Sequence, residues 1–552
     1  MAQAEGNRAS APVGGQLCPL GPRERVAWLL RINRQLGGDR ELSTVSAFAR
    51  AFRGGSHPGT AGVSTVSRWE TGRLNVSGDA IRRYEELLGL PPHLLTAAAR
   101  TTLRYLAPSA LERPPLAATA TTSAQPRTEE LLEQALSGDD MTGADWAALA
   151  GDLAAIPDAV LMPAGIWRQL TQRLVEEMVI AGGVAWMMRF EALNQLLNHP
   201  RGGPDAIARC AGIAADRANH ASTEVICALD NTAHPDSGVQ VLAQLTAPTS
   251  DRAFQGALMA CARKVAYGHF TRPQLDTVSA LCTELLGDGE AADGVVAGVA
   301  PLAAQILRSL PDRTPARLRR GLLDADGPLG HVWQRGRLAG EPGTGLVVRR
   351  IVARAVADAT RDHPSPPGED TLGDLHGLVD EMLFSPVFDI RLYTAMLLYA
   401  TPLRRPLAEA VATELARPAT ARDAVLAPSL LGALRVLGDH RSRPLVQRLT
   451  TALGLPEATV LAAAHCLGDL APGEADDHYW TDALSRHSSQ WALRRAGGSA
   501  MILQCLVYGM GMSSRYDLLT TVRDDPALPA PARAAARWWT NVPERARRSA
   551  RR

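Results

Sequence analysis

In the stretch VSTVSRWETG, residues 63–72, three small hydroxyl side chains precede one arginine. Serine and threonine hydroxyls can bond phosphates or base edges, and a guanidinium can bond guanine O6 and N7 in bidentate fashion. The residues available for this chemistry are Ser64, Thr65, Ser67 and Arg68. They indicate a surface that contacts the major groove of DNA, with an ordinary solvent-exposed helix face as the alternative.

The apolar residues of the same stretch predict a helix over residues 63–70. Val63, Val66 and Trp69 recur at i, i+3 and i+6, so all three are expected to face inward. The hydroxyl side chains and Arg68 then face outward. Gly72 is expected to end the helix.

Four further helices are predicted around this one, over residues 22–36, 44–52, 77–88 and 91–106. Pro22 suits a first helical turn, Ser43 or Thr44 suits an N-cap, and Gly89 suits a helix stop. Each segment carries an apolar stripe at helical spacing. Together they form a compact module of short helices.

The order of these elements resembles the Cro/C1 (Xre-type) helix-turn-helix family, on the strength of Ala49 at the fifth position of the second helix and of Glu70-Thr71-Gly72 after the third. The resemblance covers about 70 residues, and it implies DNA binding through the third helix. It implies base reading by Ser64, Thr65 and Arg68. It implies backbone contacts by Thr44, Ser67, Arg73 and Asn75. It implies a fold-supporting role for Glu70.

The sequence departs from the family between the second and third helices. Ala49 and Val63 are 14 positions apart, twice the spacing typical of the family. The extra residues, RGGSHPGTAG, form a Gly/Pro-rich loop over 53–62, and lengthening a flexible loop costs little. Arg53 or His57 in this loop is expected to touch a DNA phosphate, or else the contact positions shift by a residue or two.

Composition narrows the chemistry available to the chain. Of 552 residues 46% are hydrophobic, which suffices for a buried core. Lys264 is the only lysine, and it lies within an expected helix. A phosphate-binding P-loop and Schiff-base chemistry both need a lysine, so both are disfavoured. The arginine-rich bias indicates a GC-rich coding genome of actinobacterial type.

Charge is unevenly distributed although the net charge is only +1. Residues 20–90 contain 11 arginines and 7 acidic residues, a local balance of +4. A second basic cluster, RARRSARR, spans 545–552, where DNA contact and solvated surface charge are equal alternatives. Seven scattered cysteines without a CxxC pair, no signal segment and no long apolar run predict a cytoplasmic protein that does not contact a membrane.

The chain divides into five segments by composition: a disordered arm over 1–20, a helix-turn-helix domain over 21–106, a linker over 107–127, a helical repeat domain over 128–540 and a basic tail over 541–552. The linker is rich in Pro, Thr, Ala and Ser. The predicted fold class is therefore all-α: an N-terminal helix-turn-helix domain followed by a large, α-solenoid-like repeat domain.

Internal similarity supports the repeat. LGALRVLGD at 431–439 and LAAAHCLGD at 461–469 match at a spacing of 30, and LYTAMLLYA at 392–400 shares their apolar positions. Helix pairs that recur at such intervals are typical of HEAT- or TPR-like solenoids. The alternative is a generic helical domain in which Ala/Leu-rich segments match by chance. GIWRQLTQRLVEEMVIAGGVAWMMRFEALNQLL, at 165–197, predicts a pair of amphipathic helices.

A search for catalytic patterns finds no HExxH, GxSxG, GxGxxG or DxD motif. GEPGTGLVVRR at 340–350 is interpreted as a turn between helices rather than a phosphate loop. GEADDHYW at 473–480 is interpreted as a solvated inter-helix loop rather than a metal site. We therefore expect no enzymatic activity, no cofactor and no metal.

These features predict a sequence-specific transcriptional regulator that binds double-stranded DNA as a homodimer. The helical domain is expected to dimerise and to sense a peptide, protein or small-molecule effector. The alternative is a helical-repeat scaffold that recruits proteins and is merely tethered to DNA by its head. A third, weaker alternative is an enzyme whose site residues are dispersed over the helical domain.

Overall fold

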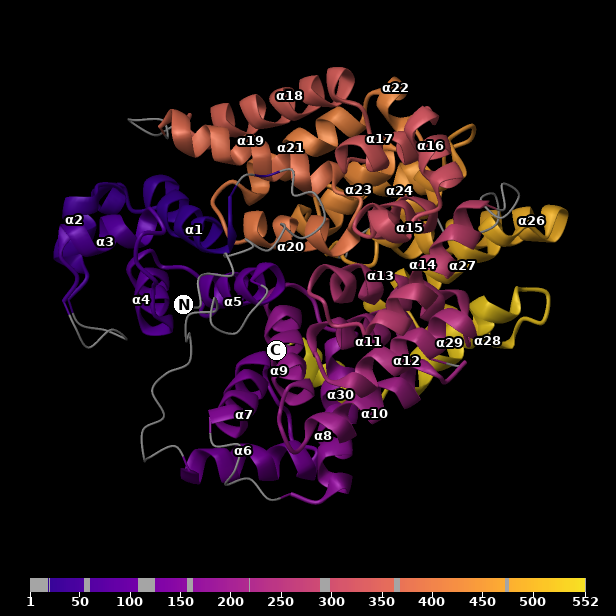
Figure 1. The fold of residues 1–552 in the computed structure, drawn as a ribbon, viewed down its shortest axis with the longest axis horizontal. Helices are drawn as coiled ribbons and strands as arrows, with labels where there is room; N and C mark the ends of the chain where they lie inside the picture. Colours follow the sequence, from indigo (N-terminus) through magenta and orange to yellow (C-terminus); the bar gives the residue numbers. More distant parts are fainter. Residues whose placement is uncertain are drawn as a thin grey trace, which may run out of the picture.

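The computed structural model describes residues 18, 20–53, 60–107, 125–155, 162–217, 219–287, 298–361, 368–471 and 476–551. Throughout these ranges the regular secondary structure is helical, which confirms the all-α class (Figure 1). Every helix in them is too short or too polar to cross a bilayer.

We call residues 20–107 the head. Its elements are α1 (Pro22–Leu36), the 3-10 helix η1 (Arg40–Ser43), α2 (Val45–Ala51), α3 (Val63–Glu70), α4 (Gly78–Leu87) and α5 (Leu94–Leu106). They agree with the five predicted helices to within a few residues. Local signals explain this agreement: the Thr44 and Ser77 hydroxyls accept the amides of Ala47 and Ala80, which caps α2 and α4.

We call residues 125–551 the body, and we divide it into two halves. The first half comprises α6 (Gln125–Ser137), α7 (Gly143–Ala155), α8 (Ala164–Met178), α9 (Gly183–Leu197), α10 (Gly203–Ala214), α11 (Ser222–Cys227), η2 (Ala228–Asn231), α12 (Pro235–Thr246), α13 (Asp251–Ala266), α14 (Arg272–Gly287), α15 (Val299–Arg308), η4 (Pro311–Arg313), α16 (Ala316–Asp324) and α17 (Pro328–Arg335). The pair expected at 165–197 is therefore confirmed as α8 and α9.

The second half comprises α18 (Glu341–Ala359), α19 (Glu369–Phe384), α20 (Phe388–Tyr399), α21 (Arg404–Leu415), α22 (Pro418–Ala421), α23 (Leu426–Leu437), α24 (Arg443–Thr451), α25 (Glu457–Cys466), α26 (Asp476–Arg494), α27 (Gly497–Met512), α28 (Tyr516–Asp524), α29 (Ala530–Asn541) and α30 (Glu544–Ala550). In Figure 1 the yellow helices α27 and α29 lie partly behind α11 to α14 of the first half, and α26 and α28 project beside them at the edge of the view.

Helices in the body pack with their second neighbours as well as with their immediate ones. One row in the first half consists of every second helix, in the order α6, α8, α10, α12, α14 and α16. Each helix of this row also packs on the helix that follows it in the chain, for example α6 on α7 and α16 on α17. In the second half α18, α21, α23, α25, α27 and α29 form another row. The matching segments at 392–400, 431–439 and 461–469 fall on α20, α23 and α25, which contact one another in that order. Assignment to a HEAT- or TPR-like class stays a prediction.

The head packs directly on the body. One hydrophobic core includes the apolar residues of α1 to α4 together with those of α18 to α29. Helix α5 contributes to both cores: Leu95, Ala98, Ala99 and Leu103 belong to this one, whereas Ala97, Tyr105 and Leu106 belong to another, which is built mainly from the first half of the body. The connection expected at 107–127 lies almost wholly outside the described residues, which resume at Gln125. The head is thus joined to the body by a shared core as well as by the chain.

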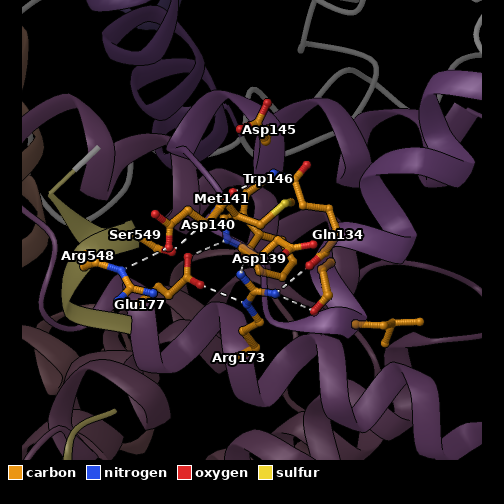
Figure 2. A network of polar contacts seen from close by, with 12 residues as sticks. Gln134, Asp139, Asp140, Met141, Asp145, Trp146, Arg173, Glu177, Arg548 and Ser549 are labelled. Atoms are coloured by element: carbon orange, nitrogen blue, oxygen red, sulfur yellow. Dashed lines mark hydrogen bonds and ion pairs between the residues drawn. The ribbon is translucent and has the colours of Figure 1, made fainter. Parts of the chain in front are cut away.

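In the described residues, most of the basic tail expected at 541–552 is helical. Residues Glu544–Ala550 form α30, which packs on α8 near the start of the body, with Ala546, Ser549 and Ala550 buried. Ser549 Oγ accepts the amide of Met141 at 3.3 Å, and its carbonyl accepts Arg189 Nη2 at 2.6 Å. Figure 2 shows Ser549 and Arg548 of α30 facing Asp140 and Met141. The two ends of the body therefore meet.

Arg189 also belongs to a buried polar network behind this contact. Glu177 accepts Trp146 Nε1 at 2.8 Å and Arg173 Nε at 3.0 Å, and it lies 3.5 Å from Arg189 Nε. Figure 2 shows Arg173 and Glu177 beneath Trp146. A carboxylate with three nitrogen neighbours is well compensated for its burial. The network fixes α7, α8 and α9 where α30 docks.

Two interpretations of segments in the body were wrong. The segment 340–350 is no turn but the beginning of α18, with Pro in its first turn and Val347, Val348, Ile351 and Val352 buried at helical spacing. That apolar stripe outweighs the helix-weakening effect of the glycines. In the segment 473–480 the described residues from Asp476 onward belong to α26, and Asp476 is buried against Arg443 at 2.9 Å.

Candidate nucleic-acid interface

Helix α3 begins after Gly62 and ends at Glu70. Gly72 adopts a left-handed φ of +71°, a conformation that costs glycine little. This turn lets the Leu74 amide bond the Arg68 carbonyl at 3.1 Å, which closes the helix end. A sharp helix end leaves the residues after it, Arg73 to Asn75, free to lie along the surface.

The inner face of α3 is held by an aromatic core. Val66 is 0% and Trp69 is 7% exposed. The Trp69 ring lies 5.4 Å from that of Phe52, which in turn contacts Phe48 and Tyr84. Aromatic pairs at such distances contribute packing energy beyond their buried area. The helix is therefore fixed in its rotation about its own axis.

Val63 differs from the prediction. It was expected to face inward with Val66 and Trp69, but half of its surface (50%) is exposed. It is also not part of the head core to which the other two belong. The first turn of α3 extends past the core, so the helical spacing alone does not bury its first residue.

The end of α3 is anchored by a buried carboxylate. Glu70 accepts Arg34 Nε on Oε1 at 2.7 Å and Arg34 Nη2 on Oε2 at 2.6 Å, a bidentate pair with both side chains buried. The Tyr84 hydroxyl lies 3.1 Å from the same Oε1, and burial, then the Glu70 charge, raises the pKa of that phenol. Glu70 therefore joins α3 to α1 and α4, which is the supporting role that the family resemblance implies.

The residues predicted to read bases occupy the outward side of α3. Ser64 and Arg68 are exposed, Thr65 is half-buried, and Ser67, predicted to contact the backbone, is exposed beside them. In Figure 1, α2 and α3 lie at the outer edge of the head, whereas α1 and α5 face the body. The helix that bears these exposed residues thus lies on the side of the head away from the body.

The other residues predicted to contact the DNA backbone lie on neighbouring segments. Thr44 is exposed at the start of α2, and Arg73 and Asn75 are exposed after α3. Arg53 is exposed at the end of α2, where its carbonyl accepts Arg83 Nη2 at 3.1 Å. Residues 54–59 lie outside the described residues, so the contact expected from His57 does too.

Polar contacts between α1 and the body were not predicted from the sequence. Arg25 pairs with Glu381 of α19 at 2.7 Å, and Arg31 pairs with Asp374 at 2.9 Å. Trp28 Nε1 donates to the Thr371 carbonyl at 3.2 Å and Asn33 Nδ2 to the Ala400 carbonyl at 2.9 Å. The available signal is that Arg25 and Asn33 lie on one helical stripe with Leu29, two turns apart.

Arg31 connects the two sides of the head. Its Nη2 reaches Asp374 of the body, and its Nη1 lies 3.4 Å from the Glu70 carbonyl at the end of α3. The position of α3 is therefore tied to α19 through one side chain.

A second polar cluster is buried where α5 meets the body. Cys227, Asp230 and Asp389 are the one group among the described residues whose ligand atoms lie close enough to hold a metal ion. However, Arg263 pairs with Asp230 at 3.0 Å and Cys227 donates to Asp389 at 3.6 Å. Burial raises the pKa of the Cys227 thiol and of both carboxyls. Arg263 already pairs with Asp230 and the Cys227 thiol already bonds Asp389, so this group is a poor ligand set for a cation.

Lys264 lies beside this cluster on α13. Its Nζ donates to the Thr232 carbonyl at 2.8 Å and to Ser237 Oγ at 2.7 Å. Burial lowers the pKa of the amine to about 8. The lysine joins η2 and α12 to α13 and is fully buried, so its surroundings indicate a structural role.

No protein-family model matches the chain, and no curated protein matches it.

Proposed function

We propose that the protein is a sequence-specific transcriptional regulator that binds double-stranded DNA and that α3 is its recognition helix. The observation that carries the proposal is the exposed row of Ser64, Ser67 and Arg68 on a helix that Glu70 anchors from behind. A helix of this kind can lie in the major groove with its N-terminal residues at base edges. The local excess of arginine over acidic residues in the head favours contact with phosphates.

The half-buried position of Thr65 changes its proposed share in recognition. Its side chain lies at the edge of the exposed row, so we assign it a smaller share than Ser64 and Arg68. Arg53, Arg73, Asn75 and Thr44 flank this row and are proposed to contact phosphates. Such contacts position the protein but carry no sequence information.

We further propose a homodimer bound to two half-sites, with the body providing the contact between copies. A single head makes few phosphate contacts, and pairing places two recognition helices one helical turn apart. Helices α1 and α5 are covered by the body and are unavailable for pairing. The body is also the proposed place for an effector, and the buried thiols are compatible with a reducing, cytoplasmic setting.

The test is selection from a random duplex library with the purified full-length protein. The variant Arg68→Ala removes the proposed guanine contact. The control Arg320→Ala removes the same charge from an exposed position on α16, in the body. We expect a two-fold symmetric site that both wild type and control select, and that Arg68→Ala relaxes at one base pair by about 1–3 kcal/mol. Salt-sensitive bulk binding without any enriched site would overturn the proposal.

A further inference from the structure

The outward side of α3 contains one apolar residue, Val63. Residues one turn apart on a helix lie above one another, so Val63 lies one turn before Ser67, and Ser64 lies one turn before Arg68. Thr71 follows Ser67 by one turn as the C-cap of the helix. All are exposed, and the Thr71 hydroxyl donates to the Ser67 carbonyl at 2.9 Å. Val63 therefore lies at the N-terminal end of the same surface that bears the polar side chains.

Val63 does not pack in the hydrophobic core of the head. Val66 and Trp69, three and six positions later, belong to the head core, whereas Val63 does not. A β-branched residue is also a weak helix former. Singly exposed apolar residues are common on proteins, so exposure alone assigns no role. The location does: Val63 is the first residue of the proposed recognition helix and is exposed on it together with Ser64, Ser67 and Arg68.

We infer that Val63 recognises the 5-methyl group of a thymine in the major groove. This inference rests on the proposed function and names one of its specificity determinants. Thymine is the one base that presents an apolar group in that groove, and apolar side chains contact it there. Valine has neither donor nor acceptor for the other base edges or for phosphate. Val63 thus reads a T·A pair beside the pairs read by Ser64 and Arg68.

The test uses the selected operator and replaces its thymines one at a time with deoxyuridine. This exchange removes the methyl group and keeps the base pair. For the wild type, affinity should fall about fourfold at one thymine per half-site, the factor that corresponds to burying one methyl group. The variant Val63→Ser should bind the thymine and deoxyuridine forms of that position equally.

The matched control is Leu74→Ser, which alters an exposed apolar residue just beyond the helix. It should keep the full sensitivity to deoxyuridine, and both variants should keep the wild-type melting temperature because both positions are exposed. An operator whose thymines all tolerate the exchange would overturn the inference. So would Val63→Ser retaining the wild-type sensitivity. If no operator is selected at all, the proposed function fails first, and this inference with it.

Discussion

Arg25 of the head and Glu381 of the body form an ion pair with 2.7 Å between Nη1 and Oε2, and their side chains are 1% and 0% exposed. Thr394 completes the group, because its hydroxyl donates to Glu381 at 3.0 Å and accepts from Arg25 at 3.3 Å. The pair lies between α1 and α19, on the side of the head opposite α3. A buried ion pair of this kind fixes one geometry more than it adds stability.

We expect Glu381→Ala to destabilise the protein by about 3–5 kcal/mol, because it leaves the Arg25 guanidinium buried without its partner. Denaturant unfolding followed by circular dichroism measures this. Glu409→Ala is the control: Glu409 pairs with Arg405 on the surface at 2.8 Å, where removal should cost about 1 kcal/mol or less. The double variant Arg25→Met, Glu381→Leu should recover most of the loss. Equal free energies of unfolding for Glu381→Ala and Glu409→Ala would contradict the expected cost of leaving Arg25 buried and unpaired.

The Glu70 carboxylate gives a prediction that separates folding from recognition. Glu70→Ala leaves Arg34 buried and unpaired, so it should lower the free energy of unfolding by several kcal/mol, of the order of 3. Arg68→Ala changes an exposed residue and should stay within about 0.5 kcal/mol of wild type. Tyr84→Phe, which removes one hydrogen bond to Glu70, should cost about 1 kcal/mol. Calorimetry of the four proteins checks this order, and a Glu70→Ala protein as stable as Arg68→Ala would refute it.

Replacing either of two helical glycines of the body with alanine should change the stability of the protein in opposite directions. A Cβ on Gly511 of α27 would lie 2.1 Å from Cδ2 of the buried Trp539, whereas one on Gly432 of α23 would have nothing within 4 Å. Gly511→Ala should therefore destabilise by about 1–3 kcal/mol through overpacking. Gly432→Ala should stabilise by up to about 1 kcal/mol through helix propensity. Melting temperatures that move in the same direction would contradict the close packing of α27 on α29 at Gly511.

Local signals suffice to predict the five helices of the head. Proline in a first turn, hydroxyl caps at Thr44 and Ser77 and a glycine stop at Gly72 act within a few residues of the helix ends. The exposed row of α3 follows from the helical spacing of its apolar residues. Val63 is the exception, because whether it is buried depends on how far the core extends toward the start of the helix. Spacing along a helix cannot reveal that extent.

The joining of head and body could not be predicted in this way. Arg25 and Thr394 are 369 positions apart, and neither residue's neighbours in the chain indicate the other. Helix α1 has an apolar stripe that accounts for its packing inside the head. Its second buried face, which packs on the body, contains Arg25 and so shows no apolar pattern that would predict the contact. The folding of the basic tail into α30 was missed for a related reason: its buried side is made of Ala546, Ser549 and Ala550, which are too small and polar to form a visible stripe.

Glu224 predicts a pH dependence at the junction between the two halves of the body. Glu224 lies on α11. The charged groups that act on its carboxyl are Arg252 of α13 and, from the second half, Arg435 and Asp469. Its Oε2 is buried without a hydrogen-bond partner in the described part of the chain. Burial, opposed by Arg435, raises the pKa of this carboxyl to about 7 from an ordinary value of 4.5.

A raised carboxyl pKa means that the folded protein binds this proton more tightly than the unfolded chain does. The resulting stabilisation is fully present below about pH 4.5 and is lost as the pH rises through about 7. Glutamine at this position stays neutral at every pH. The free energy of unfolding of Glu224→Gln, relative to that of the wild type, should therefore increase by up to about 3 kcal/mol between pH 5 and 8. Glu284→Gln, an exposed site on α14, should follow the wild-type profile. Denaturant unfolding across this range decides the matter, since parallel profiles for wild type and Glu224→Gln would mean that Glu224 ionises as it does in water.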